Sequence, residues 1–346
     1  MNIAVEIGAY GIKVAIQNNG KVEMVKLGDS LSPYIIPSLA YVAKSGQIIF
    51  GNLAELCDIN NGERIYLSEM MPSDNKTEEI YEKLFAFIKD LIVSSYKQSV
   101  SNVAMIVPPY FQSVDPRKKV MREAWMHNGI YNLDFISSDV STCYRKLNLS
   151  NNESALVFDI GYNGTVISVV RRDKNVFRSI ANKYIKGIGG RVFCNMIYSD
   201  IEEQSKLQYD SFAQIIQVQN IDRVSRMIME CLSTEEHVVT SVPFTDYIYS
   251  ISREKFNEMI NKPLEESLNE CLACIKDSGD SMDNIKKIVL TGGCSQIPYI
   301  EKILKLFLNT GNSEKIDIIA PKSTEDSLFA ACKGAFTIQQ TSILKF

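Results

Sequence analysis

Two stretches of this sequence repeat one pattern: NIAVEIGAYGIKVAI at residues 2–16 and ALVFDIGYNGTVISVV at residues 155–170. In each, an apolar run rich in β-branched residues ends in an acid, an isoleucine and a glycine. A short turn closed by a second glycine then leads into another apolar run. The repeat aligns three pairs of residues: Glu6 with Asp159, Gly8 with Gly161, and Gly11 with Gly164. A strand–turn–strand unit that occurs twice predicts a chain built from two related halves.

Length, composition and charge narrow the class of protein. With 346 residues the chain exceeds the size at which one core is usual, so we expect two lobes. A hydrophobic content of 45% and a charged content of 23% are typical of a globular protein. The net charge of -4 gives the chain no positive field that would attract DNA or an anionic membrane. We therefore expect no nucleic-acid partner and no membrane association. The first residues lack a signal-peptide pattern, which favours a cytoplasmic protein.

Between the two repeats, predicted strands alternate with predicted helices. Helical spacing of apolar residues covers residues 77–98 and 115–129, and a strand over residues 102–107 ends at a Pro-Pro pair. In the second half, a long helix is expected from Arg253 to about Asp277. This alternation is typical of α/β layers with a covered sheet.

The glycine turns point to phosphate chemistry. A glycine turn after a strand lets backbone N–H groups approach an anion, although a single turn is explained better as an ordinary tight hairpin. Two turns in matching register, each preceded by a carboxylate, favour a polyphosphate held from both sides, with Glu6 and Asp159 binding Mg²⁺ through water. A third turn at residues 291–294 follows a strand and opens a helix. It suits a nucleoside, an anion at the N-terminus of that helix, or close helix–strand packing.

The eight cysteines are scattered through the chain, unlike the dense framework of a small secreted fold, so we expect reduced thiols. Cys271 and Cys274 form a C-x-x-C within a helical pattern that has no second cysteine pair or histidine nearby. Buried helix positions explain this pair better than zinc or redox chemistry.

The order of five motifs carries a resemblance to a known family. EIGAYG, IVPPYF, FDIGYNG, KGIGG and VLTGGCSQIP follow one another as in the nucleotide-binding domain of DnaK-type heat-shock chaperones, within the actin and sugar-kinase ATPase superfamily. The resemblance runs essentially from end to end. It implies an α/β actin-like ATPase fold, in which two pseudo-symmetric lobes, each a mixed sheet flanked by helices, surround a nucleotide cleft. It also implies ATP or ADP with Mg²⁺ as cofactors.

The resemblance assigns roles to particular residues. Glu6 and Asp159 take the catalytic and Mg²⁺-binding positions. The nucleotide-contacting positions are Gly8, Ala9 and Tyr10; Gly161, Tyr162 and Asn163; Gly189 and Gly190; Ser233; and Gly292, Gly293, Cys294 and Gln296. Lys13 lies where actin-like relatives place a phosphate-contacting lysine, and a lysine on an edge strand explains it equally well.

The same resemblance divides the chain. Lobe I is expected over residues 1–150, with a shortened peripheral subdomain at about 33–77. Lobe II is expected over residues 151–346, with a peripheral subdomain at about 195–285 and a C-terminal helix that returns to lobe I. We expect no peptide-binding domain within this sequence, in contrast to the chaperones.

Departures from the family pattern predict weak catalysis. The threonines of the first turn are replaced by Ala9 and Tyr10, and the segment at residues 61–71 has no counterpart of the catalytic lysine. The glutamate between the lobes corresponds to Ser138 or Asp139. The sequence therefore predicts at most a slow ATPase that binds adenine nucleotide between its lobes and acts as a nucleotide-gated module for a protein partner. The alternatives are a pseudo-ATPase scaffold that binds partners without nucleotide, and an actin-like filament protein.

Overall fold

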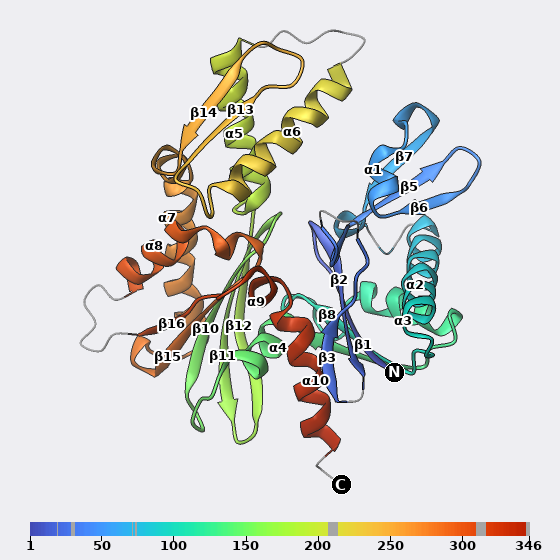
Figure 1. Cartoon of the computed structure of the whole chain (residues 1–346). Helices are drawn as coiled ribbons and strands as arrows, with labels where there is room; N and C mark the ends of the chain where they lie inside the picture. Colours follow the sequence, from blue (N-terminus) through green and yellow to red (C-terminus); the bar gives the residue numbers. More distant parts are fainter. Residues whose placement is uncertain are drawn as a thin grey trace. The chain divides into compact units, whose positions relative to one another are not determined.

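The computed structural model describes residues 1–18, 20–28, 32–70, 72, 75–206, 214–308 and 316–343 (Figure 1). The chain divides into two compact units. The first unit comprises Met1–Asn152, Val170–Ile180 and Leu328–Phe346, and the second comprises Glu153–Val169 and Ala181–Ser327. The C-terminal helix and the end of one hairpin from the middle of the chain thus belong to the first unit. No helix among the described residues is both long and apolar enough to span a bilayer.

A mixed sheet forms the centre of the first unit. Its strands are β1 (Asn2–Ile7), β2 (Gly11–Asn18), β3 (Lys21–Met24), β4 (Ile35–Pro37), β8 (Asn102–Val107) and β9 (Asn132–Ser137). The order is β3-β2-β1-β8-β9, and β4 also pairs with β2. The β1–β2 hairpin is antiparallel, whereas β1, β8 and β9 run parallel.

Alternation along β1 sends its side chains to two different cores. Ile3 and Val5 join a cluster that contains Trp125, whereas Ala4 joins a cluster on the opposite face. The helices concerned are α2 (Asn75–Tyr96), α3 (Pro116–His127), α4 (Ser138–Lys146) and α10 (Ala330–Ile343). Phe85 of α2 stacks on Trp125 of α3 with ring centroids 4.3 Å apart. On the Ala4 face, α10 packs against α4 and the sheet.

A smaller sheet extends the first unit after β4. It consists of β5 (Leu39–Ala43), β6 (Ile48–Phe50) and β7 (Gly62–Tyr66) in the order β6-β5-β7. One helix, α1 (Asn52–Leu56), and two short 3₁₀ turns, η1 (Ile59–Asn61) and η2 (Leu67–Glu69), accompany it.

The second unit is built on a sheet of the same strand order. Its strands are β10 (Ser154–Ile160), β11 (Gly164–Asp173), β12 (Val176–Lys186), β15 (Ile285–Thr291) and β16 (Asp317–Ile319). The order β12-β11-β10-β15-β16 repeats β3-β2-β1-β8-β9 position by position, and β10, β15 and β16 run parallel as β1, β8 and β9 do. The predicted α/β fold with mixed sheets flanked by helices is therefore confirmed.

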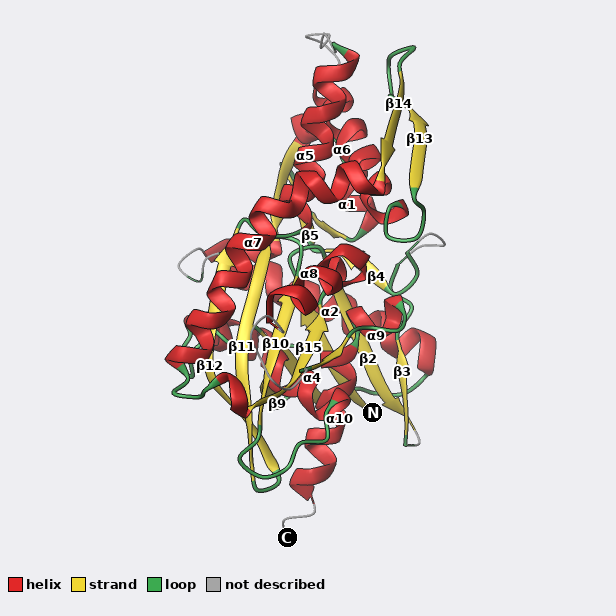
Figure 2. Cartoon of the chain, turned by 90° about the vertical axis from the view of Figure 1, so that its left-hand side faces the viewer, coloured by secondary structure: helices red, strands yellow, loops and turns green. Residues whose placement is uncertain are grey.

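Helices cover this sheet, and a two-stranded ribbon lies beside two of them. The elements are α5 (Gly190–Ser205), α6 (Gln214–Cys231), β13 (His237–Ser241), β14 (Ile248–Ser252), α7 (Arg253–Asp277), η3 (Met282–Asn284), η4 (Gly293–Gln296), α8 (Pro298–Leu308) and α9 (Thr324–Leu328). Figure 2 shows the β13–β14 ribbon beside α5 and α6, at the end of the unit away from the sheet. The helix α7 has the bounds that the sequence predicts. Cys271 and Cys274 are buried on it, and all eight cysteines are free thiols.

Candidate functional site

The first glycine turn joins β1 to β2. The Gly8 N–H donates to the Gly11 carbonyl at 3.1 Å and closes the turn. Gly11 itself has no room for a side chain, because a Cβ there would lie 2.8 Å from the carbonyl oxygen of Ile36 in β4. Of the other turn residues, Ala9 is half-buried and Tyr10 is 38% exposed. Neither is a serine or threonine, so this turn presents no short hydroxyl.

The second glycine turn joins β10 to β11 and repeats this construction. The Gly161 N–H donates to the Gly164 carbonyl at 3.0 Å. A Cβ on Gly164 would lie 2.5 Å from the carbonyl oxygen of Ile185 in β12. In both turns the first glycine closes the loop, and the second allows a neighbouring strand to approach. The register predicted from the sequence repeat is present in the backbone.

In the first unit, Glu6 and Lys13 form an ion pair beside the turn. The two residues are cross-strand partners on β1 and β2, so their side chains leave the sheet on one face. Lys13 Nζ donates to Glu6 Oε1 at 2.7 Å and to the Leu328 carbonyl at 3.0 Å. Their side chains are only 13% and 21% exposed, for Lys13 and Glu6 respectively. Because β2 pairs with β1 and β3 and also with β4, Lys13 does not lie on an edge strand.

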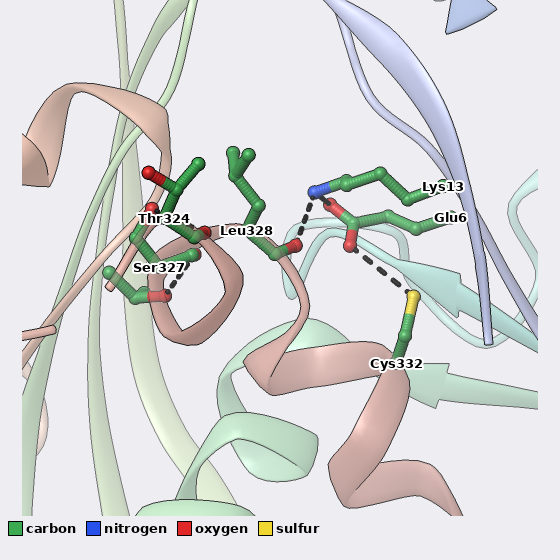
Figure 3. A network of polar contacts seen from close by, with 7 residues as sticks. Glu6, Lys13, Thr324, Ser327, Leu328 and Cys332 are labelled. Carbon is green, nitrogen blue, oxygen red and sulfur yellow. Dashed lines mark hydrogen bonds and ion pairs between the residues drawn. The ribbon is translucent and has the colours of Figure 1, made fainter. Parts of the chain in front are cut away.

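The other oxygen of Glu6 faces a cysteine of the C-terminal helix. The Cys332 thiol donates to Glu6 Oε2 at 3.8 Å, a weak contact of sulfur length (Figure 3). Burial raises the pKa of Cys332 well above its usual value, and the nearby Glu6 carboxylate raises it further. The thiol is therefore neutral at physiological pH and acts as a donor. Both oxygens of Glu6 thus have partners from this chain.

In the second unit, three glycine turns meet. The Gly190 N–H donates to the Gly161 carbonyl at 3.0 Å. Cys294 Sγ lies 3.4 Å from the same carbonyl oxygen. Gly292 packs on the end of β10, where a Cβ would lie 2.4 Å from Asp159 Oδ1. The predicted residues of this half therefore converge: Asp159; Gly161, Tyr162 and Asn163; Gly189 and Gly190; and Gly292, Gly293 and Cys294.

The aromatic ring of Tyr162 covers part of this convergence. A Cβ on Gly190 would lie 3.1 Å from the ring of Tyr162 and 3.0 Å from Cys294 Sγ. The thioether methyl of Met229 lies 3.7 Å from the same point. Burial raises the pKa of Tyr162 to about 12, and the Coulombic effect of Arg226 opposes this shift. The ring and two sulfur-containing side chains therefore pack around Gly190.

Two other predicted residues of the second unit have hydrogen-bond partners of their own. Ser233 Oγ donates to the Met229 carbonyl one turn earlier, at 3.4 Å. The side chain of Gln296 accepts a hydrogen bond from Thr324 Oγ1 at 2.6 Å and so connects η4 to α9. Both side chains thus make hydrogen bonds within the second unit.

The two residues that could replace the family's glutamate behave differently. Asp139 is 3% exposed at the start of α4, whereas Ser138 is half-buried. One oxygen of Asp139 accepts from the Val140 N–H at 2.7 Å and from the Ser137 hydroxyl, and the other accepts from Ser179 Oγ at 2.6 Å. With three donors around it, this carboxylate stabilises the first unit rather than presenting an acceptor to a ligand.

Replacing Ser179 with Ala should lower the free energy of unfolding by about 2 kcal/mol, because a buried carboxylate loses one of its three donors. Ser94→Ala serves as the control. Among the described residues, its exposed hydroxyl bonds only to the carbonyl of Leu91 in its own helix, so the expected loss is under about 0.5 kcal/mol. Urea denaturation followed by circular dichroism compares the two variants. Equal losses would show that Ser179 does not support Asp139.

Comparison with known proteins places this chain in a family. The family model described as Hsp70 protein matches residues 55–318, which is more than half of the chain. The chain belongs to the Hsp70 family. The Hsp70 match includes the turns at Gly161, Gly190 and Gly292, and it begins after the turn at Gly8.

Curated relatives of this Hsp70 chain include chaperone protein HscA homologs from three Haemophilus influenzae strains, PittGG, PittEE and 86-028NP. Each is 26% identical over 219 residues, which is 63% of this chain and 34% of the relative. The matched part thus spans about a third of the length of these relatives.

Hsp70 ATPase domains generally bind ATP or ADP with Mg²⁺. Mg²⁺ requires oxygen ligands or the waters that they hold. At the first turn, an ammonium group already lies 2.7 Å from Glu6 Oε1, and a thiol faces Oε2. Within the described ranges, no group of three or more His, Cys, Asp or Glu side chains could hold a metal ion. The residues around Glu6 therefore do not fit the family's metal.

The sequence did not predict three residues of this Hsp70 chain that contact the candidate site residues of the first unit. Leu328 and Cys332 contact Lys13 and Glu6 from the far end of the chain, and Ser179 binds Asp139 from a hairpin. No motif marks any of them. The alternation of β1 and β2 would, however, have placed Glu6 and Lys13 on one face.

Proposed function

We propose that this Hsp70-family chain binds an adenine nucleotide at its two glycine turns and hydrolyses it slowly or not at all. The observation that supports the proposal most strongly is the repeated construction of the turns. Each follows the central strand of a sheet of the same strand order, each is closed by the same glycine hydrogen bond, and each is preceded by a carboxylate, Glu6 or Asp159. Family membership supports the choice of an adenine nucleotide.

The weak hydrolysis follows from groups that are missing or already occupied. Ala9 and Tyr10 do not supply the short hydroxyl of a serine or threonine to a phosphate, and the Asp139 carboxylate is held by Ser137, Val140 and Ser179. Removing one group that stabilises a transition state typically costs 10²–10³ in rate, so several losses together leave very slow turnover.

The biological role that fits such a chain is a switch for a protein partner. We propose that the bound nucleotide biases the chain toward one of two states, which the partner distinguishes. A ligand shifts such an equilibrium only by its difference in affinity for the two states, so turnover is not required. The partner itself is a protein of unidentified sequence.

Calorimetric titration with ATP and ADP tests the binding. Saturating nucleotide should also raise the thermal midpoint, because ligand at 100 times its Kd adds about 2.7 kcal/mol of apparent stability. Phosphate release measures turnover. In Asp159→Asn any hydrolysis should disappear while the far-ultraviolet circular dichroism stays unchanged. Absence of both heat and thermal shift at millimolar nucleotide would overturn the proposal.

A second candidate function has one observation in its favour. The Tyr162 ring, Cys294 and Met229 pack around Gly190, where the Hsp70 resemblance places the ribose and phosphate. A scaffold that binds partners without nucleotide would tolerate this filling. Tyr162→Gly distinguishes the two candidates. Nucleotide binding that appears only in this variant would support the scaffold, and binding by the unaltered chain would exclude it.

A further inference from the structure

Lys13 is held in place more firmly than a surface lysine. Its ammonium contacts Glu6 from β1 and the Leu328 carbonyl from the segment before α10, so acceptors from two separate elements orient it. Only 13% of its side chain is exposed. Figure 3 shows Lys13 and Glu6 extending side by side toward Leu328 and Cys332. The first unit thus carries a fixed positive charge close to its glycine turn.

This ammonium and a divalent cation compete for one carboxylate. A metal ion approaching Glu6 would either displace Lys13 from Oε1 or lie beside a positive charge in a half-buried site, where screening by water is weak. Displacement would leave a mostly buried ammonium without its carboxylate. On the other side of Glu6, the neutral thiol of Cys332 is a poor ligand for Mg²⁺, which prefers oxygen.

The same ion pair also removes the repulsion that a bare Glu6 carboxylate would exert on a phosphate. A polyphosphate needs nearby positive charge, and a bare carboxylate next to it would be repulsive. With Lys13 in contact, the carboxylate charge of Glu6 is balanced by the chain itself. A lysine ammonium is an established phosphate-binding group that acts as a point charge.

We propose that Lys13 takes the place of the divalent cation beside Glu6, so that this chain binds nucleotide phosphates without Mg²⁺. The inference rests on the proposed nucleotide binding and specifies its cofactor requirement. Glu6 then serves to position the Lys13 ammonium, and the Leu328 carbonyl fixes its direction from the other side.

Calorimetric titration of the full chain with ATP, once with excess EDTA and once with MgCl₂, tests the proposal. The two dissociation constants should agree within about threefold. Lys13→Met should weaken binding in EDTA by about 10- to 100-fold, as expected for loss of a charge-assisted contact. In the same variant Glu6 has lost its ammonium, so added Mg²⁺ should restore part of the affinity. Lys13→Arg should retain metal-free binding.

Two controls show whether a change in ATP binding comes from Lys13 itself, rather than from the loss of any lysine or from misfolding. Lys21→Met removes an exposed lysine on β3 that pairs with Glu23, and it should change neither titration. Mn²⁺ added with ATP, and followed by its paramagnetic resonance signal, should bind more tightly to Lys13→Met than to the unaltered chain. A thermal melt of each variant shows whether it folds, and Lys13→Arg provides the comparison if Lys13→Met does not.

The outcomes distinguish this inference from the function on which it rests. ATP binding that requires Mg²⁺ in the unaltered chain would overturn the role of Lys13 and leave the nucleotide-binding function intact. ATP binding under neither condition would overturn both. Equal binding with and without Mg²⁺, lost in Lys13→Met with EDTA, would support the inference.

Discussion

Replacing Gly292 with Ala is expected to lower the free energy of unfolding by about 4 kcal/mol and to abolish nucleotide binding by the second unit. Gly292 has φ +86°, which costs an L-residue about 1 kcal/mol. A Cβ there would also lie 2.4 Å from Asp159 Oδ1 and 2.5 Å from the Ile160 carbonyl oxygen. Part of that obstruction is backbone of β10, so the turn itself has to move, which typically costs a further 1–3 kcal/mol or more.

Gly187→Ala separates the two contributions of this substitution. Gly187 has φ +85°, and nothing lies within 4 Å of the position that a Cβ would take. The control should therefore lose only about 1 kcal/mol, from the backbone conformation alone. Thermal melts of the two variants, together with ATP titrations, give the comparison. If both variants lose the same stability, close packing of the third turn on β10 is not what requires the glycine.

This packing answers a question that the sequence left open. The turn at residues 291–294 was compatible with a nucleoside contact or with close packing. The structure shows that Gly292 is required by the approach to Asp159 and Ile160, whatever the turn binds. Gly11 and Gly164 are comparable, since each admits a neighbouring strand. A glycine in such a motif is therefore evidence, in the first place, that another backbone segment lies too close to leave room for a side chain.

The fold was predictable because its signals are local. An apolar run, an acid and a glycine turn can each be recognised within a few residues of sequence. The repeat at residues 155–170 showed that the same strand–turn–strand unit occurs twice. The helix from Arg253 to Asp277 followed from spacing alone. Alternation along β1 also sets which face Glu6 occupies, because Ala4 and Glu6 are two residues apart.

The partners of the site residues were not predictable in this way. Leu328 and Cys332 are separated from Lys13 and Glu6 by 315 and 326 residues, and no periodicity links such distant positions. For the same reason, the sequence did not show whether Ser138 or Asp139 corresponds to the family's glutamate. It depends on Ser179, a hairpin residue 40 positions away that supplies a donor to the buried carboxylate. Long-range contacts determine which side chains of a motif already have partners.

The crossing of α4 and α10 holds the segment that carries Leu328 and Cys332, and Gly334 makes this crossing close. A Cβ on Gly334 would lie 1.8 Å from the Ser141 carbonyl oxygen, which belongs to the backbone of α4. In return, the Ser141 hydroxyl donates to the Ala331 carbonyl at 2.6 Å. Gly334→Ala gains about 1 kcal/mol of helix propensity, but it forces the helices apart and breaks this bond. We expect a net loss of about 3 kcal/mol, measured by urea denaturation.

Lys333→Ala is the matched control on the same helix. Burial lowers the pKa of Lys333, and Arg145 lowers it further, so the charge of this side chain does not stabilise the folded state. Its removal should therefore cost little stability. Because α10 also carries Cys332, separation of the helices in Gly334→Ala should withdraw the thiol from Glu6 and speed its reaction with a thiol reagent. A variant as stable as the unaltered chain, with Cys332 still protected, would contradict the close crossing.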